Sequence, residues 1–388
     1  MIKLVIITNI LTPYRQNFFD VFDRVAKDND VKLHVFAMSN TEHSRDWMYH
    51  DLARDYTELL EKRVFVGRED SMYYSPNLCK RLNEIKPDII VLAGSYTLFP
   101  VWQALRWAKY NKRKVLFWSE SHLDETRSMN KVKYFVRDII RKVFYGTVDG
   151  FWYPGEKARR LIDKYSNPGK IYIQVPNMVD GDRLLKKQEN IKMSTAELRE
   201  KYGLSSEKRI FFSPARLIPV KGFEEFLEAI KDTTMKDRFQ IAIAGDGELR
   251  ERIMRLAIKE QIDVVLLGHR NADEVAELFK ASDFMLLPSI SDANPLVCIE
   301  ALWCGKPLLV SEHVGNYPEV VDEGVNGYVF SYKKMGDALE KLECMVVSGT
   351  IWRREAEEKS MGLANEQFDI CRNCKKMVND IVHIARSF

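Results

Sequence analysis

The chain has 388 residues, of which 46% are apolar and 30% charged, and its formal net charge is +3. This length predicts two domains, each large enough to bury its own core, with the composition of a soluble globular protein. The sequence excludes a membrane-spanning helix, because no apolar run approaches the ~20 residues that cross a bilayer. The first strand, within MIKLVIITNI, shows no signal-peptide cleavage site. The six scattered cysteines, including Cys371-x2-Cys374, indicate reduced thiols in a cytosolic protein rather than a zinc site.

Strands and helices alternate along the N-terminal half. Strands are expected at 4–8, 31–36, 89–93, 115–119, 150–153 and 171–175, and helices near 14–27, 75–85, 99–111, 129–145 and 155–165. This alternation predicts a doubly wound parallel sheet over residues 1–185. A polar, charged segment at 180–208 breaks the rhythm, so we expect an interdomain linker at 186–207.

Basic residues are concentrated in this N-terminal half. Residues 1–185 carry 30 Lys and Arg against 23 Asp and Glu, and residues 101–142 alone carry 11 against 4. Aromatic residues lie among these cations: Trp102, Trp107, Tyr110, Tyr134, Phe135 and Phe144. The amphipathic pattern KVKYFVRDIIRKVFY suits an anionic membrane surface. Alternatively, its apolar face is core and its basic face only solvated. Nucleic acid is not expected as a partner, because no binding motif accompanies the charge.

The same alternation resumes in the C-terminal half. Strands are expected at 210–213, 241–244, 264–267, 284–287 and 308–310, and helices near 222–231, 247–259, 271–281, 295–304 and 333–347. A second Rossmann-like domain is therefore predicted at 208–365, giving an α/β chain with a cleft between facing strand ends. From 351 onward the pattern is helical, with an interruption near 362–365. No G-x-G-x-x-G follows the first strand of either domain, which argues against an NAD dehydrogenase.

The stretch 285–330 holds the most informative pattern of the chain. After a buried strand and a polar loop, Asn294 is a candidate N-cap and Pro295 a candidate first helical residue. The helix that follows has one charge, Glu300, and Gly305 is expected to end it in a left-handed conformation. A lone carboxylate there either pairs with an internal cation or lines a cleft and accepts hydrogen bonds from a ligand.

Two features favour a ligand site. The amides of Leu296 and Val297, at the helix N-terminus beside Asn294, lack intrahelical partners and suit a phosphate. Asp292 precedes Glu300 by eight residues on the loop before the helix, so the two carboxylates could flank one ligand.

These motifs carry a family resemblance. Asp292-x7-Glu300, followed by ALWCGKP and GNYPEVV, resembles the donor-site signature of retaining GT-B glycosyltransferases, especially family 4 (group 1). The usual pattern has Glu at both ends of the interval, and Asp292 is one methylene shorter. The resemblance implies the GT-B fold, in which two Rossmann-like domains face each other across a cleft. It assigns the acceptor to 1–185, the nucleotide-sugar donor to 208–365, and a helix crossing back to the first domain to 366–388.

Further donor residues follow from the pattern and the resemblance. Arg216 and Lys221 lie five residues apart on the turn after the strand at 210–213 and suit a diphosphate. In the family, Glu300 accepts both ribose hydroxyls, Asp292 contacts the donor sugar, and the amides of Leu296 and Val297 meet phosphate. Glycines and a histidine after two other strands would border the base: Gly245, Gly247, Gly268 and His269. Glu319 is expected to be structural, as a cap of the following helix.

Acceptor residues are expected in the N-terminal domain. The loop after its first strand contains Thr12, Pro13, Tyr14 and Arg15, and it lacks the glycine pair common in the family. Glu120 and His122 follow the strand at 115–119, where either could orient the acceptor hydroxyl or take its proton. A satisfied polar contact at a strand end is the alternative for both.

The resulting hypothesis is a retaining, metal-independent glycosyltransferase of the hexosyltransferase type. No Asp-x-Asp pair accompanies the signature, so Arg216, Lys221 and the helix N-terminus are expected to replace a metal on the diphosphate. The expected donor is a UDP-sugar, or alternatively a GDP-sugar, with no other cofactor. The acceptor would be a glycan or lipid-linked saccharide of surface polysaccharide assembly, used by a cytoplasmic protein that is peripheral at the inner membrane face. The alternatives are a non-catalytic sugar-nucleotide-binding scaffold and an epimerase or phosphorylase acting without transfer.

Overall fold

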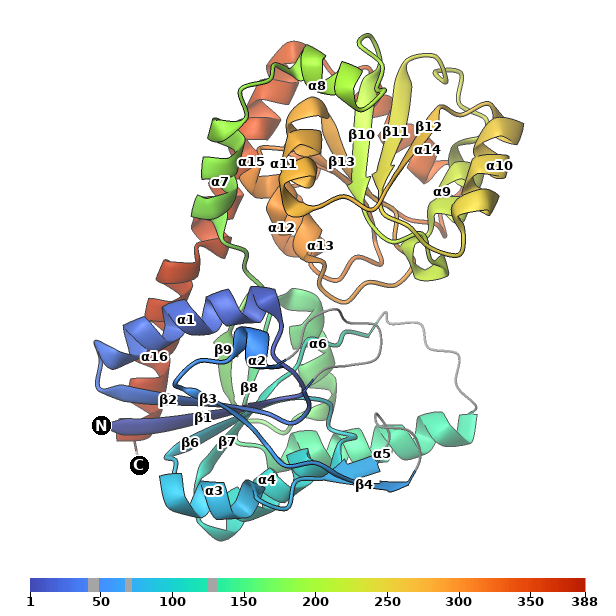
Figure 1. Cartoon of the computed structure of the whole chain (residues 1–388). Helices are drawn as coiled ribbons and strands as arrows, with labels where there is room; N and C mark the ends of the chain where they lie inside the picture. The colour runs from blue at the N-terminus through green and yellow to red at the C-terminus, as the bar shows by residue number, and fades with distance from the viewer. Residues whose placement is uncertain (41–48, 67–71, 124–130, 388) are drawn as a thin grey trace. The chain divides into compact units, whose positions relative to one another are not determined.

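The chain forms two compact units in a computed structural model that describes all residues except 41–48, 67–71, 124–130 and 388 (Figure 1). The N-terminal unit extends to Met178 and also includes the last helix, α16 (Ile370–Arg386). The C-terminal unit runs from Val179 to Asp369. None of the described helices is long and apolar enough to cross a membrane.

A seven-stranded parallel sheet organises the N-terminal unit. Its strand order is β3-β2-β1-β6-β7-β8-β9. The strands are β1 (Ile2–Thr8), β2 (Val31–Ala37), β3 (Thr57–Leu59), β6 (Ile89–Ala93), β7 (Lys114–Trp118), β8 (Gly150–Tyr153) and β9 (Ile171–Gln174). The helices are α1 (Pro13–Lys27), α2 (Tyr49–Leu52), α3 (Leu78–Ile85), α4 (Phe99–Tyr110), α5 (Lys131–Thr147) and α6 (Glu156–Tyr165). An antiparallel pair, β4 (Arg63–Val66) and β5 (Met72–Tyr74), lies outside the main sheet.

Both faces of this sheet are buried, as the doubly wound prediction requires. Successive residues of β1 belong to two separate cores: Leu4 and Ile6 to one, Val5 and Ile7 to the other. The first core also receives Met377 and Ile381 from α16, which packs against α1 and β9. Alternate side chains of a strand point to opposite faces, so an unbroken apolar strand needs a layer of helices on each side.

A six-stranded parallel sheet organises the C-terminal unit, with the order β12-β11-β10-β13-β14-β15. The strands are β10 (Arg209–Pro214), β11 (Phe239–Ala244), β12 (Val264–Gly268), β13 (Phe284–Leu287), β14 (Leu308–Ser311) and β15 (Gly327–Phe330). The helices are α7 (Gly181–Asn190), α8 (Thr195–Lys201), the 3-10 turn η1 (Pro219–Lys221), α9 (Phe223–Ile230), α10 (Arg250–Glu260), α11 (Ala272–Ala281), α12 (Leu296–Trp303), α13 (Tyr317–Val320), α14 (Asp337–Val346) and α15 (Thr350–Phe368).

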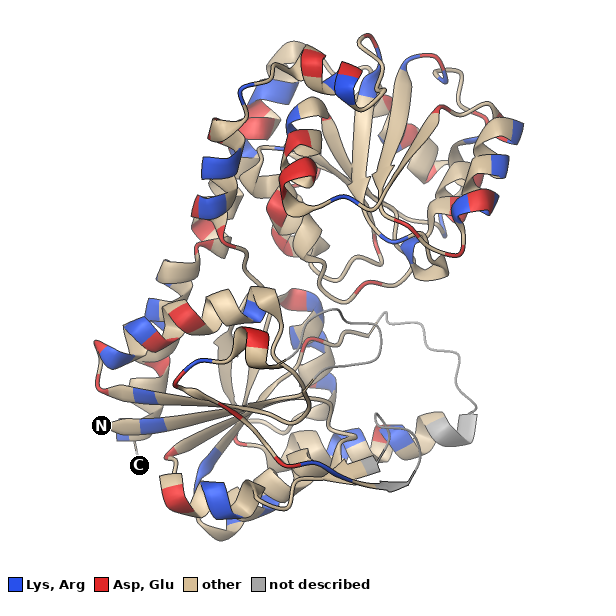
Figure 2. Cartoon of the chain, viewed as in Figure 1, with Lys and Arg blue, Asp and Glu red and all other residues tan. Residues whose placement is uncertain are grey.

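Charge distribution agrees with the buried position of both sheets. Lys, Arg, Asp and Glu lie on the helices, the loops and the strand starts, while the strands of the C-terminal sheet are almost free of them (Figure 2).

In both sheets the strand order reverses direction beside the first strand, between β1 and β6 and between β10 and β13. Open α/β sheets bind ligands outside the carboxyl ends of the strands at this position.

Three details differ from the sequence predictions. The expected linker at 186–207 contains α7 and α8, which belong to the C-terminal unit: Gln188 donates to the Ala276 carbonyl, and Arg199 pairs with Asp283. Helix α15 is continuous through Gly362, where an interruption was expected, and ends at Phe368 before α16. The short strands β3, β4, β5 and β15 were not predicted, because three or four residues give little periodicity to detect.

Candidate functional site

Two backbone loops meet where the C-terminal strand order reverses. The loop after β13 is joined to η1 by a hydrogen bond, which the Ile290 amide donates to the Val220 carbonyl. The distance between nitrogen and oxygen is 3.0 Å, as in a good hydrogen bond. Gly222 has a φ of +68°, and a Cβ there would lie 2.2 Å from the Pro288 carbonyl oxygen. Only glycine therefore lets the two loops approach this closely.

Tyr332, which the sequence reasoning missed, fastens the same two loops together. Its buried hydroxyl contacts the carbonyl oxygens of Pro288 at 2.6 Å and Gly222 at 3.2 Å. Burial raises the pKa of this phenol well above its ordinary value, so it stays a neutral donor. The available signal was a polar-tipped aromatic residue two positions after the strand that ends at Phe330.

The structure brings Lys221 and Asp292 together as an ion pair. Each side chain is only 17% exposed, and the Ser289 hydroxyl lies 3.4 Å from the same carboxylate oxygen. The two residues were predicted to contact different parts of a donor, a phosphate and a sugar. In the absence of a donor, opposite charges this little exposed satisfy each other, because either one alone would lose solvation without compensation.

Arg216, on the same loop as Lys221, is exposed, and its guanidinium makes no hydrogen bond or ion pair with any residue that the structure describes. It is thus a cation available to an anionic ligand at the carboxyl end of β10.

Glu300 has no internal counter-ion among the described parts of the chain. Its carboxylate makes no hydrogen bond or ion pair there, and burial raises its pKa. The described residues thus offer no internal cation for Glu300, which favours the alternative of a ligand-facing carboxylate. The buried Cys298 thiol interacts electrostatically with Asp292, Lys221 and Glu300. Burial, together with the two carboxylates, raises the pKa of this thiol.

The helix that carries Glu300 begins slightly later than predicted. Pro295 occupies the N-cap position, Leu296 is the first helical residue, and no side chain caps the helix, so Asn294 is not its N-cap. The Asn316 amide instead fixes the entry by donating to the Pro295 carbonyl at 3.0 Å. A proline just outside the first turn still sets an extended approach, which leaves the amides of α12 at the loop end. As predicted, Gly305 ends the helix with a φ of +65°.

The glycine loops after β11 and β12 lie beside the Arg216 loop. The Ala215 amide donates to the Ala244 carbonyl, and a Cβ on Gly245 would lie 2.1 Å from the Ala215 oxygen. Gly245 is bridged to Gly268. Close backbone packing thus explains the glycine at position 245. It also explains Gly247, where a Cβ would meet other backbone atoms of the Arg216 loop. His269 follows Gly268 and is exposed.

Predicted acceptor-side residues converge within the N-terminal unit. Arg15 forms an ion pair with Glu120 at 2.8 Å, its guanidinium lies 4.5 Å from the ring centroid of Trp118, and it donates to the Thr8 hydroxyl at 3.3 Å. Burial opposes the charged form of Arg15, but Glu120 and Tyr14 together outweigh it and raise the guanidinium pKa. Glu120 is therefore already an acceptor for Arg15, which makes an orienting role fit it better than that of a free base.

The remaining acceptor-side residues differ in exposure. Thr12 and His122 are buried, whereas Pro13 and Tyr14 are exposed at the start of α1. Glu319 lies in the first turn of α13, where its amide donates to the Asn316 carbonyl. Asn316 is the N-cap of α13 and no side chain caps this helix, so the expected cap by Glu319 is wrong and its structural role stays a prediction.

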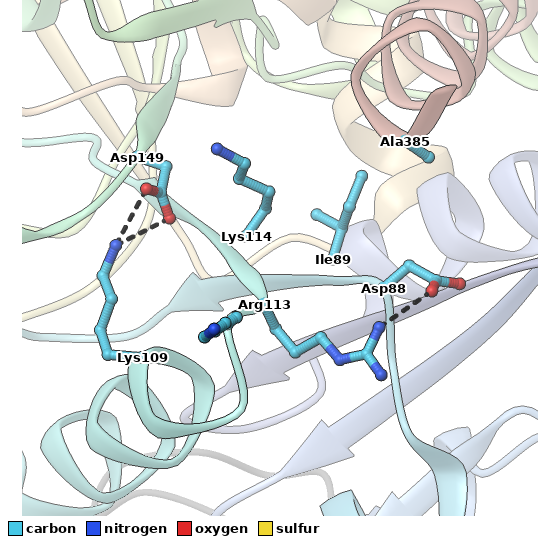
Figure 3. Close-up of a pocket in the computed structure, with 8 residues that line it drawn as sticks. Asp88, Ile89, Lys109, Arg113, Lys114, Asp149 and Ala385 are labelled. Atoms are coloured by element: carbon cyan, nitrogen blue, oxygen red, sulfur yellow. Dashed lines mark hydrogen bonds and ion pairs between the residues drawn. The ribbon is translucent and has the colours of Figure 1, made fainter. Parts of the chain in front are cut away.

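Two features elsewhere fit structural explanations. The chain has Asp-x-Asp pairs at 28–30 and 180–182, in the turn before β2 and at the start of α7, where Asp180 caps the helix by accepting from the Arg183 amide. Figure 3 shows a hollow at the amino ends of β6, β7 and β8, away from the strand ends that hold the predicted residues. Two of its cations are held in ion pairs: Lys109 pairs with both oxygens of Asp149, and Arg113 with Asp88.

Comparison with known proteins agrees with this geometry. Residues 194–355 match the family model of the group 1 glycosyl transferases. This part of the chain is therefore similar to the group 1 glycosyl transferases. The fold of the chain is GT-B, and it superposes on Anabaena HepE in complex with UDP with a TM-score of 0.71, at 15% identity over 99% of this chain and 100% of the other.

Two curated relatives show similarity over more than half of this chain. The Escherichia coli UDP-Gal:alpha-D-GlcNAc-diphosphoundecaprenol alpha-1,3-galactosyltransferase is 32% identical over 60% of this chain and 55% of its own length. The Streptococcus pneumoniae alpha-monoglucosyldiacylglycerol synthase is 27% identical over 61% of this chain and 52% of its own. The chain spans about a third to about half of the length of the curated relatives it matches.

Proposed function

We propose that the chain is a retaining glycosyltransferase that moves a hexose from a nucleotide sugar to a glycan or lipid-linked saccharide. The observation that carries the proposal is Glu300, which is partly buried and has no hydrogen-bond or ion-pair partner among the described residues. It lies in the helix that follows the loop of the Lys221–Asp292 pair, where the strand order reverses. A buried carboxylate without a partner is costly unless a ligand supplies one. The match of residues 194–355 to the group 1 glycosyl transferases supports a sugar donor as that ligand and a transferase as the activity.

Each donor residue has a role that its position supports. Glu300 accepts the two ribose hydroxyls, for which a carboxylate has matching oxygens. Arg216 and Lys221 hold the diphosphate, with the α12 amides of Leu296 and Val297 adding partial positive charge. Asp292, released from Lys221, accepts from the donor sugar.

The base and its surroundings complete the donor. Gly245, Gly247, Gly268 and His269 border the base, and Asn294 lies at the phosphate end of α12. The donor is a UDP-sugar, with a GDP-sugar as the alternative. The UDP complex of HepE and the UDP-Gal donor in the name of the Escherichia coli relative support UDP.

The reaction runs without a metal and with retention. Arg216, Lys221 and the helix N-terminus stabilise the charge that develops on the leaving diphosphate. The departing phosphate oxygen takes the proton of the acceptor hydroxyl on the same face of the sugar, so no strong protein base is needed. Arg15 and Glu120 orient the acceptor through their ion pair, together with Thr12, Pro13, Tyr14 and His122.

The acceptor class places the protein at the cytoplasmic side of a membrane, in surface polysaccharide or glycoconjugate synthesis. Both relatives support it by name: one acts on an undecaprenol-linked saccharide and the other makes a glucosyl lipid. Membrane association would be peripheral and would use the basic region 101–142, which also contains α4 and α5.

The first test is thermal unfolding with UDP, GDP, ADP and dTDP, without metal and then with magnesium. Ligand binding stabilises the folded state by mass action, by about 2.7 kcal/mol at a hundredfold excess over Kd. We expect a metal-independent shift with UDP. Transfer from UDP-hexoses to undecaprenol-linked saccharides, with the anomeric configuration of the product read by NMR, then tests retention. Nucleotide binding without any turnover would instead support a scaffold.

A further inference from the structure

Helix α5 exposes an apolar face that the rest of its unit does not cover. Phe135 is 65% exposed, and Val143, Val136, Ile139 and Ile140 lie between 54% and 38%. These five residues, here called the α5 apolar face, follow one another at i, i+1, i+4, i+5 and i+8, which is one side of a helix. Contiguous exposed apolar side chains on a helix of a folded protein mark an interaction surface.

The opposite side of α5 is buried in the core, so the α5 apolar face is not needed to attach the helix to its unit. Phe144 and Tyr145 are buried. Arg141 is also buried, donates to the Tyr96 hydroxyl at 3.2 Å, and lies over the ring of Tyr165. A helix held this way cannot roll its other side inward without breaking these contacts.

The surface is narrower than the basic stretch 101–142 predicted from sequence. On α4, Trp107 is buried, and Trp102 packs edge-on against Phe144 with centroids 5.1 Å apart. These aromatic residues are core, which is the alternative left open for them. The docking surface is therefore α5, not the whole stretch.

The charge of α5 indicates which partner covers the α5 apolar face. Residues 131–147 contain five Lys and Arg against one Asp, and Lys142, which directly precedes Val143 of the apolar face, is exposed. We propose that the α5 apolar face inserts into the headgroup boundary of an anionic phospholipid bilayer. Apolar side chains flanked by cations are what such a surface recognises. A second copy of the chain, paired across a two-fold axis, would instead bring like charges together.

The same helix is joined to the acceptor-side residues. The Tyr145 hydroxyl lies 2.9 Å from the Ser119 hydroxyl, and the next residue, Glu120, pairs with Arg15. Docking through α5 thus brings the acceptor-side loop to the lipid surface. Docking therefore favours a lipid-linked saccharide over a free glycan as the acceptor. This choice of acceptor rests on the proposed transferase function, whereas the docking itself does not.

The test is co-sedimentation of the full chain with phosphatidylcholine vesicles, with and without phosphatidylglycerol. We expect binding to the anionic vesicles that salt weakens, and a loss of at least about tenfold in affinity for Phe135→Ser/Ile139→Ser. The matched control is Ile258→Ser/Ile351→Ser, which removes apolar side chains that are at least as exposed from the C-terminal unit. This control should bind as the unchanged protein does.

Three results would overturn the docking. These are no binding of the unchanged protein to anionic vesicles, equal loss in the control variant, or a concentration-dependent dimer that Phe135→Ser/Ile139→Ser abolishes. UDP-induced thermal stabilisation of the same variants separates the two proposals. Stabilisation without vesicle binding refutes only the docking, whereas vesicle binding without a nucleotide shift refutes only the transferase.

Discussion

Replacing Glu300 with Gln should separate ligand binding from folding. The carboxylate is partly buried, makes no hydrogen bond or ion pair with any described residue, and has a pKa raised by burial. Gln has nearly the same size but no charge, so the packing of α12 is kept. The substitution removes an unfavourable buried charge and, if the donor assignment is correct, the acceptor of two ribose hydroxyls.

The magnitude on the binding side follows from the number of bonds at stake. A hydrogen bond to a charged group contributes about 1.5–3 kcal/mol. Losing one such contribution weakens nucleotide binding roughly ten- to hundredfold, at about 1.4 kcal/mol per factor of ten. Glu300→Ala, which removes both oxygens, should abolish transfer.

The effect on stability has the opposite sign. A carboxyl whose pKa is raised in the folded state binds more protons folded than unfolded, so its penalty grows as pH rises through the ordinary range of about 4 and above. At pH 7.5, Glu300→Gln should therefore unfold at the same temperature as the parent or a higher one. Well below pH 4 the carboxyl is protonated in both states, and the difference should vanish.

The assay is differential scanning fluorimetry of Glu300→Gln across pH, with and without UDP, beside Glu358→Gln on an exposed part of α15. The expected pattern is a retained or raised midpoint and a lost UDP shift in Glu300→Gln only. A lowered midpoint with a normal UDP shift would show that Glu300 is structural, and the donor assignment would fail with it.

Three further substitutions probe the loops around this carboxylate. Lys221→Ala should weaken UDP binding roughly tenfold while leaving uridine binding unchanged by calorimetry, and equal losses for both would contradict a diphosphate contact. Gly222→Ala should lower the melting midpoint far more than Gly324→Ala, since both glycines have positive φ but only Gly222 faces a carbonyl at 2.2 Å. Tyr332→Phe should cost about 1–3 kcal/mol in urea unfolding, because the Pro288 carbonyl loses its donor, and an unchanged midpoint would refute that bond's contribution.

Much of the fold could be predicted because its central strands are unbroken apolar runs. Buried parallel strands such as 89–93 and 284–287 have no polar side to confuse the pattern, and the helices between them keep a clear period. Segment 186–207 was harder, because charged residues cover the exposed sides of α7 and α8 and hide the few contacts that attach them. The Arg199–Asp283 pair spans 84 residues of sequence, and no local pattern reveals it.

The site could be predicted only residue by residue. Spacing alone placed Asp292 and Glu300 on one loop-and-helix element, and the structure keeps them there. It could not show that Asp292 pairs with Lys221, 71 residues away, or that Glu120 pairs with Arg15. Ion pairs depend on side-chain direction across neighbouring strands, and periodicity carries no such information. How the two units face each other likewise stays a prediction.

The charges of the donor site divide into a satisfied pair and unsatisfied groups, and this division decides which residue tests the site best. A donor would take Lys221 and Asp292 from each other and give each a new polar partner, so the exchange gains little net energy. Glu300 and Arg216 have no described partner to give up. Their contacts with a donor are gained outright, and they should dominate its affinity. Substituting Asp292 would mix a lost sugar contact with a freed lysine, whereas substituting Glu300 removes a donor contact without freeing a described partner.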